Sequence, residues 1–135
     1  MKVALVGFSK KSMEIFHGLL SLGDEVVSFI DSSIQNVYIT NSTCSLEALM
    51  DADIVIDFSK GESLVENMIM YSRLALPALI VATLAQDQKE TVEALCYGED
   101  TKILCSDMFS TASAEEIIVS ARWILDTDKI GIIFK

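Results

Sequence analysis

Apolar runs of strand length alternate with helical patterns along the whole chain, and this alternation limits the possible folds most strongly. Runs such as 3–6 and 54–57 are almost continuously apolar and do not alternate with polar residues. Strands of that composition are typical of a sheet that is covered on both faces. Segments such as 13–22 lie between them and carry apolar residues at helical spacing. The pattern predicts a parallel sheet whose strands are joined by right-handed helical crossovers.

The expected fold class is α/β, a Rossmann-like three-layer fold with a mainly parallel, doubly wound sheet. The chain has 135 residues and shows no internal repeat or linker, so one domain spanning 1–135 is expected. The expected strands are 3–6, 25–30, a weaker 37–40, 54–57, 79–83, 102–105 and 130–134. The expected helices are 13–22, 46–50, 62–75, one opening near Asp87 and one opening after Ser113.

The chain is strongly acidic, with a formal net charge of −10. This charge argues against binding to nucleic acid or to an anionic membrane surface, because phosphate contacts need clustered Lys or Arg. The apolar stretches are short and broken by charge, which predicts neither a transmembrane span nor a signal peptide. The three cysteines have no metal-binding spacing, and reduced thiols in a cytoplasmic protein are expected.

The first turn, VGFSKKSM at residues 6–13, joins the first strand to the first helix. A turn that holds a dinucleotide pyrophosphate normally carries three glycines in the pattern G-x-G-x-x-G. Only Gly7 is present here, while Lys10 and Lys11 stand where small residues are usual. The free N–H groups of the helix and the two lysines are the remaining candidates for phosphate contacts.

Asp31 follows the second strand directly. A carboxylate at this point can accept hydrogen bonds from an adenosine ribose and repel a 2′-phosphate, which favours NAD over NADP. The alternative is a solvated carboxylate that caps a turn with Ser32 and Ser33. Both interpretations remain open from the sequence.

The most distinctive string is IDFS at residues 56–59, at the end of a strand expected in the middle of the sheet. Its acid or hydroxyl can serve as a cap for the next helix. The string is followed by Glu66-Asn67, by a strand ending near 81–84 and by Phe109-Ser110 before a capped helix. This ordered set resembles the N-terminal domain of dihydrodipicolinate reductase, also called 4-hydroxy-tetrahydrodipicolinate reductase, of the bacterial lysine and diaminopimelate pathway.

The resemblance implies a binding site for NAD or NADP. In the family, the first turn, the IDFS backbone, a G-T-T-G loop and an N-F-S-x-G passage lie along the cofactor. The chain has ATLA at 82–85 in place of the third segment and MFSTA at 108–112 in place of the fourth. The residues predicted to contact the cofactor are Gly7, Phe8, Ser9, Lys10, Lys11, Asp31, Phe58, Ser59, Ala82, Thr83 and Phe109.

Several family glycines are replaced in this chain. A lysine stands near the second glycine of the first turn, and a side chain there intrudes where the backbone approaches the pyrophosphate. Ala82, Ala85 and Ala112 replace glycines of the later loops. We therefore expect the affinity for a dinucleotide to be weakened or lost, with NAD favoured over NADP.

The family's second domain, which carries a His-His pair, a lysine acid and a substrate loop, has no counterpart after the strand from Ile130 to Phe134. His17, the one histidine, is not expected to be catalytic, and the sequence predicts no catalytic residue and no metal site. Two interpretations follow. The chain is a reductase-like cofactor-binding domain that is inactive alone, or a non-catalytic module that acts through self-association or a protein partner. In either case the last strand is predicted to mediate a homo-oligomer or bind a partner if it lies at a sheet edge, and to be covered otherwise.

Overall fold

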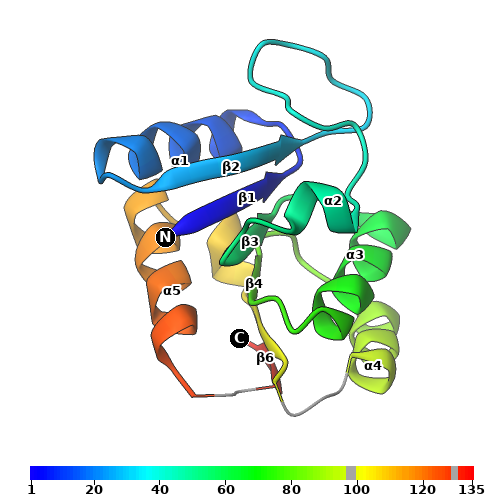
Figure 1. Cartoon of the computed structure of the whole chain (residues 1–135). Helices are drawn as coiled ribbons and strands as arrows, with labels where there is room; N and C mark the ends of the chain where they lie inside the picture. Colours follow the sequence, from blue (N-terminus) through cyan, green and yellow to red (C-terminus); the bar gives the residue numbers. More distant parts are fainter. Residues whose placement is uncertain (97–99, 129–130) are drawn as a thin grey trace.

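The computed structural model describes residues 1–96, 100–128 and 131–135 and contains a six-stranded sheet in which every strand pair is parallel (Figure 1). The strand order is β2-β1-β3-β4-β5-β6. This arrangement is the expected Rossmann-like three-layer fold in a single domain. The strands are β1 (Lys2–Val6), β2 (Glu25–Ile30), β3 (Ile54–Asp57), β4 (Ala78–Ile80), β5 (Lys102–Cys105) and β6 (Gly131–Phe134).

Helices cover both faces of the sheet (Figure 1). One face is covered by α1 and α5, which cross so closely at Gly18 that a Cβ there would lie 3.0 Å from the Ile118 side chain. The other face is covered by the short α2 and by α3 and α4. The helices are α1 (Lys10–Ser21), α2 (Leu46–Leu49), α3 (Gly61–Arg73), α4 (Gln86–Leu95) and α5 (Ala114–Asp126), with a 3₁₀ turn, η1, at Asp107–Ser110.

The core consists of two apolar layers, one on each face of the sheet. Val3 and Leu5 of β1 pack with the α1 and α5 side chains, whereas Ala4 and Val6 pack with α2 and α3. All four are buried. Successive side chains of a strand point to opposite faces, so a strand between two helical layers is apolar at every position. This explains the continuous apolar runs and confirms the prediction of a sheet covered on both sides.

The weak strand expected at residues 37–40 is absent, and that prediction was wrong. Asn36 folds the segment into a turn, in which its side-chain oxygen accepts from the Tyr38 N–H at 2.9 Å. Val37 is 93% exposed, so its β-branched side chain has no sheet surface against which to pack. Thr40 and Asn41 donate backbone hydrogen bonds to the end of β2, and Asn41 forms an isolated bridge with Ile30. Ile130, the first residue of the last expected strand, lies outside the described residues.

The topology places a crevice at the carboxyl ends of the first three strands. The chain leaves β1 for β2 on one side and later returns to β3 on the other side of β1. The crossovers on either side of β1 therefore diverge onto opposite faces of the sheet. Ligands of doubly wound sheets bind at such a switch point.

Gly7 sits in this crevice and is required by the local geometry. Its φ is +94°, a backbone conformation that side-chain-bearing residues rarely adopt. A Cβ at this position would lie 3.2 Å from the Phe58 Cβ and 3.3 Å from its carbonyl carbon. The Phe58 N–H donates to the Val6 carbonyl at 2.7 Å, which fixes this close approach. The glycine thus allows the turn after β1 to contact the end of β3.

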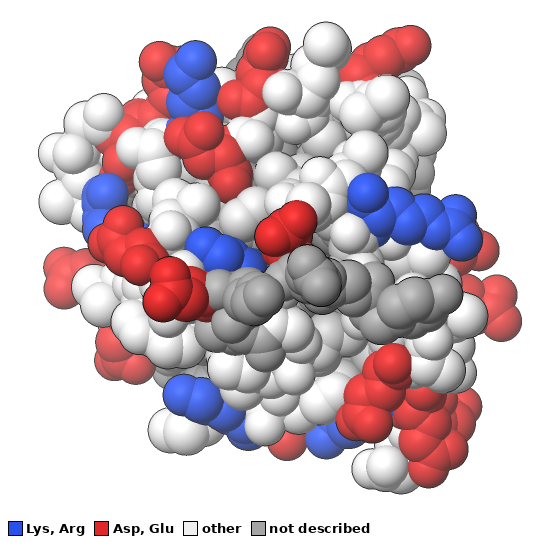
Figure 2. All heavy atoms as spheres, turned by 60° about the horizontal axis from the view of Figure 1, so that its bottom comes forward, with Lys and Arg blue, Asp and Glu red and all other residues white. Residues whose placement is uncertain are grey.

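Acidic side chains dominate the surface, in keeping with the net charge of −10. Figure 2 views the side of the molecule at the bottom of Figure 1, where basic side chains lie between groups of acidic ones. Within the described ranges, no helix is both long and apolar enough to cross a membrane.

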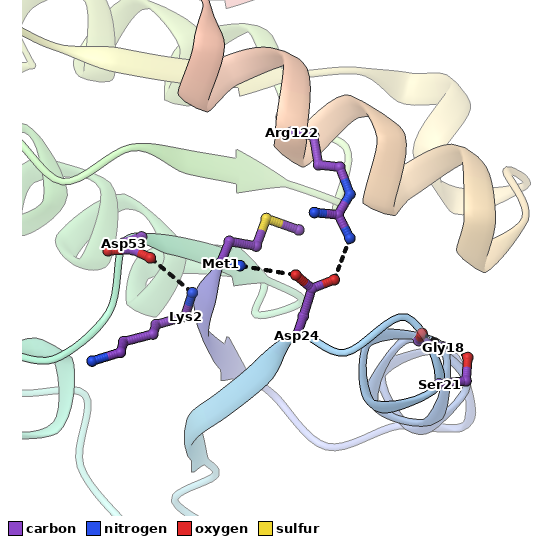
Figure 3. Close-up of polar contacts among 7 residues, drawn as sticks. All are labelled: Met1, Lys2, Gly18, Ser21, Asp24, Asp53 and Arg122. Atoms are coloured by element: carbon purple, nitrogen blue, oxygen red, sulfur yellow. Dashed lines mark hydrogen bonds and ion pairs between the residues drawn. The ribbon is translucent and has the colours of Figure 1, made fainter.

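At the amino ends of the strands, Asp24 joins three parts of the chain (Figure 3). Its carboxylate accepts from the Met1 amine at 2.8 Å and from the Arg122 guanidinium of α5. Burial raises the pKa of Asp24, but these hydrogen bonds and the two positive charges outweigh burial and lower it. The ionised carboxylate therefore holds β1, the start of β2 and α5 together.

We expect Gly7→Ala to lower the free energy of unfolding by about 2–4 kcal/mol, because positive-φ strain adds to overpacking against Phe58. Gly23→Ala is the matched control, since Gly23 has φ +83° but no atom within 4 Å of a built Cβ. In this control, positive-φ strain alone should lower the free energy of unfolding by about 1–2 kcal/mol. Urea unfolding of both variants measures the difference. Equal losses would show that the contact with Phe58 does not constrain the turn.

Candidate functional site

A cleft of about 540 Å³ lies at the switch point, at the carboxyl ends of β1, β2 and β3. Its size falls within the usual range of small-molecule sites. Its apolar walls come from β1, β2 and two phenylalanines, and hydroxyl groups come from the surrounding loops. The lining residues are Val6, Gly7, Phe8, Ser9, Ile30, Asp31, Ser32, Ser33, Ser42, Thr43, Cys44, Phe58, Ser59, Lys60, Ser63, Glu66 and Asn67.

Six of the eleven residues predicted to contact a cofactor line this cleft. They come from three separate segments of the chain, which are the turn after β1, the end of β2 and the end of β3. The structure brings these three segments together at one cleft, while their role in binding stays a prediction. The six residues are Gly7, Phe8, Ser9, Asp31, Phe58 and Ser59.

Asp31 is already engaged by the protein. Its Oδ1 accepts from the N–H groups of Ser33 and Ile34, both at 2.8 Å, and its Oδ2 accepts from the Phe8 N–H at 2.7 Å. Burial raises the pKa of Asp31, but these hydrogen bonds outweigh burial and lower the pKa. The turn-capping interpretation thus describes its contacts. Among the described residues, Oδ2 has one donor, so this oxygen can accept one more hydrogen bond.

The first turn of α1 is capped by its own side chains. The helix begins at Lys10, three residues before the expected start, with Ser9 as its N-cap. The Ser12 N–H donates to the Ser9 hydroxyl at 3.1 Å, and the Ser9 N–H donates to the Ser12 hydroxyl at 2.7 Å. Such a capping box uses the N–H groups that hold a phosphate in dinucleotide-binding turns. An anion at this point must compete with the box.

The two lysines of the first turn do not line the cleft. The Lys11 ammonium donates to the Ala112 carbonyl, which joins α1 to the segment before α5. Lys10 is exposed at the start of the helix. The suggestion that these lysines compensate for the missing glycines has no support in this arrangement.

A buried polar network lies beneath the cleft, centred on Asp57 at the end of β3. The carboxylate is completely buried and accepts from the Tyr71 hydroxyl at 2.6 Å. It also accepts from the Ser59 N–H at 2.7 Å and the Ser59 hydroxyl at 2.5 Å, while Asn67 donates at 3.3 Å. Four donors on one carboxylate fix the positions of Ser59 and Asn67 in the cleft wall.

The expectation that Asp57 or Ser59 caps the following helix was wrong. The N-cap of α3 is Lys60, and no side chain makes a cap hydrogen bond there. The carboxylate instead binds the turn between β3 and α3 from inside and reaches Tyr71, fourteen residues further along the chain. Its role is to hold α3 against the sheet.

Burial determines how the network ionises. Burial raises the pKa of Asp57 more than the hydrogen bonds from Ser59, Tyr71 and Asn67 lower it. Burial and the adjacent carboxylate raise the pKa of Tyr71 well above its usual value, so this hydroxyl keeps its proton. Burial also raises the pKa of Cys44 to about 11, although its contact with the Tyr71 hydroxyl at 3.6 Å acts in the opposite direction. The thiol is therefore a poor nucleophile at neutral pH.

The three remaining predicted residues lie elsewhere. Ala82 lines a small cavity with Phe134 and Lys135 at the carboxyl ends of the later strands. Thr83 is exposed, and Phe109 is 7% exposed in η1 and belongs to the core. The structure therefore places these residues apart from the switch-point cleft.

Sequence reasoning missed the polar residues that complete the site. Asn67 and Tyr71 are four residues apart, so both point from one face of α3 toward Asp57. That spacing was a usable signal, because two polar groups on the inner face of a helix need a partner. Cys44 and the hydroxyls at 42–43 come from an irregular loop, and no pattern in the sequence indicates that it folds over the cleft.

The charged groups that line the cleft are Asp31, Glu66 and Lys60. The acids outnumber the lysine, so the lining favours a neutral or hydroxyl-rich ligand over a strongly anionic one. In the described part of the chain, no group of three His, Cys, Asp or Glu side chains is placed to hold a metal ion.

Comparison with family models and with curated proteins finds no match to this chain. The relation to dihydrodipicolinate reductase stays a prediction from the residues.

We expect Tyr71→Phe to destabilise the protein more above the raised folded-state pKa of Asp57 than below it. The raised pKa of Asp57 means that the folded state holds its proton more tightly than the unfolded state. Its stabilising contribution is therefore complete below an unfolded pKa of about 4 and is lost as pH rises through the folded pKa. Above the folded pKa the carboxylate is charged, and losing the Tyr71 hydrogen bond should lower the free energy of unfolding by about 1.5–3 kcal/mol. Below it the carboxyl group is neutral, and the same loss should cost about 0.5–1.5 kcal/mol.

Urea unfolding of wild type and variant at several pH values tests this, because the difference cancels the titration of other carboxyl groups. Tyr38→Phe is the matched control, since Tyr38 is 39% exposed and lies in the loop after β2. A loss that is independent of pH would contradict the assignment.

Proposed function

We propose that this chain is a reductase-like, Rossmann-type module whose switch-point cleft binds the nucleoside end of NAD(H) with low affinity. By the resemblance, its relatives are dihydrodipicolinate reductases of the bacterial lysine and diaminopimelate pathway, and the cytoplasm is its proposed location. The chain described here does not reduce a substrate by itself in this proposal.

The observation that carries the proposal is the contact of the turn after β1 with the end of β3. Gly7 brings that turn within 3.2–3.4 Å of Phe58 and Ser59, measured from a built Cβ. The same contact puts Asp31 beside the Phe8 N–H at 2.7 Å. An acceptor at the end of the second strand is therefore next to apolar ring surface, which is the pairing that a ribose and its base require.

The affinity should be low because several of the phosphate-binding groups are already occupied. The Ser9–Ser12 capping box uses N–H groups of the α1 terminus, and the Lys11 ammonium is bound to the Ala112 carbonyl. A pyrophosphate gains little by replacing hydrogen bonds that already exist. The nucleoside contacts must then supply most of the binding free energy.

The proposed cofactor is NAD(H), with NADP(H) disfavoured. A 2′-phosphate on the ribose would lie against the Asp31 carboxylate, whose lowered pKa keeps it charged at neutral pH. The negative charges of the phosphate and the carboxylate would repel each other. The free acceptor position on Oδ2 suits a ribose hydroxyl donor instead.

No catalytic role is assigned to the cleft. The buried Tyr71 hydroxyl donates to Asp57 and the Cys44 thiol is protonated, so neither is a ready nucleophile. Hydride transfer to an imine needs a proton donor and a substrate clamp beside the nicotinamide. In this proposal both would have to come from outside the described residues.

A second candidate function is a non-catalytic module that acts through self-association or a protein partner, without cofactor. The observation that favours it is the internal use of Asp31, of the capping box and of Lys11. A turn whose polar groups satisfy one another is stable without a ligand.

Titration with NADH and NADPH distinguishes the two candidates. We expect saturable NADH binding with a Kd of about 0.1–1 mM and NADPH binding weaker by about five-fold or more. Glu66→Lys converts an exposed acid in the cleft wall to a cation and should tighten NADH binding about three- to ten-fold. Fluorescence or calorimetry measures each constant.

Glu93→Lys is the matched control, because this exposed residue of α4 changes the net charge equally without lining the cleft. Its affinity should equal that of the wild type. Absence of saturable binding at about 5 mM NADH would contradict the cofactor proposal and favour the second candidate.

A further inference from the structure

The two edges of the sheet differ in how they are covered. Along β2, the Thr40 N–H donates to the Phe29 carbonyl at 2.8 Å, and the Phe29 N–H donates to the Thr40 hydroxyl at 2.9 Å. Asn41 continues this cover with a bridge to Ile30. Along β6, no described segment makes a hydrogen bond on the side away from β5. In the part of the chain that the structure describes, the β2 edge is therefore covered at its carboxyl end, whereas the β6 edge is open along its length.

The outward-facing backbone groups of β6 follow from its pairing. The Gly131 N–H donates to the Thr101 carbonyl and the Lys135 N–H to the Cys105 carbonyl, both at 2.8 Å. In a parallel ladder the residues that bond to one neighbour alternate with those that face away. The N–H and C=O groups of Ile132 and Phe134 are consequently directed outward.

The open edge lacks the features that usually prevent strand addition. β6 has the sequence GIIF and contains no charge and no proline. Its four residues are only partly buried although they are mostly apolar. Natural edge strands are normally protected by charges, prolines or bulges. An unprotected apolar edge on a highly charged protein indicates a surface that is covered in use.

Two cavities at opposite ends of the β5–β6 part of the sheet carry opposite net charge among their described lining side chains. A cavity at the carboxyl end of β6 is lined by two lysines and one acid, namely Lys89, Lys135 and Asp107. A second cavity, at the amino end of β5, is lined by two acids and one lysine, namely Asp100, Asp128 and Lys102. An antiparallel arrangement of two such edges brings the basic end of each next to the acidic end of the other.

We propose that a second copy of this chain binds the β6 edge, in an antiparallel pairing about a two-fold axis through Ile133. Ile132 of each copy then pairs with Phe134 of the other, and each of these residues donates and accepts one backbone hydrogen bond. Lys135 lies near Asp128 of the second copy. A two-fold axis requires the antiparallel direction, and it closes the assembly at two chains.

The proposal is independent of the cleft, since the β6 edge is separated from β1 by three strands. Loss of cofactor binding would therefore leave it unaffected. The short paired segment and the net charge of −10 on each copy make the association modest, so it should depend on concentration.

Sedimentation equilibrium between about 10 and 500 µM tests the proposal. We expect a monomer–dimer equilibrium in which Lys135→Glu and Asp128→Lys each weaken association about five-fold or more. The double variant, which exchanges the two charges, should restore the wild-type constant. Ile132→Pro removes an outward N–H that the β5 ladder does not use, and it should abolish the dimer.

Lys2→Glu and Asp51→Lys are the matched controls, because these exposed residues lie at β1 and before β3 and change the net charge equally. Their association constants should equal that of the wild type. A chain that stays monomeric at about 500 µM overturns the proposal. A dimer whose association constant is unchanged in the charge variants also overturns the proposal. The double variant Lys135→Glu/Asp128→Lys tests the proposal even where Ile132→Pro does not fold.

Discussion

The close contact between the turn after β1 and the end of β3 is the constraint on which the rest of the site depends. It exists because Gly7 has a positive φ and no Cβ, which lets the turn approach the Phe58 backbone. The contact places the Phe8 N–H within reach of Asp31 and so ties the first two strand ends together. It also sets the position of Ser59, through which the cleft wall is joined to the buried carboxylate of Asp57.

Around that contact, the polar groups are largely satisfied within the protein. Asp31 holds the turns on both sides of it, the capping box closes the start of α1, and Tyr71 and Asn67 hold Asp57. A site built in this way is rigid without a ligand, and a ligand gains only from positions that remain open. The open positions are one lone pair of Asp31, the hydroxyl-bearing rim and the aromatic walls.

The sequence was sufficient for those parts of the structure that depend on a strong local pattern. Continuous apolar runs identified six of the seven expected strands, because a strand between two helical layers must be apolar throughout. The exception at residues 37–40 has β-branched residues, but Val37 is exposed and Asn36 folds the segment into a turn instead. Propensity without burial was not enough to form a strand there.

Within the site, the sequence predicted which segments meet, but it did not predict the contacts that their side chains make. The parallel topology required the ends of β1, β2 and β3 to meet, so Gly7, Asp31 and Ser59 could be grouped in advance. It did not reveal that Lys11 turns away to the Ala112 carbonyl, since the direction of a long side chain depends on acceptors from a distant segment. The contribution of Tyr71 was hidden for the same reason, because its partner Asp57 lies on another element.

The central proposal is that the cleft holds a nucleoside while its first turn offers a pyrophosphate few open groups. Comparing the affinities of adenosine and of ADP for the purified chain tests it most directly. If the N–H groups of the first turn and Lys11 stay occupied, the two dissociation constants should agree within about three-fold. ADP binding tighter than adenosine by about thirty-fold or more would show that the turn opens to bind phosphate, and it would contradict the account.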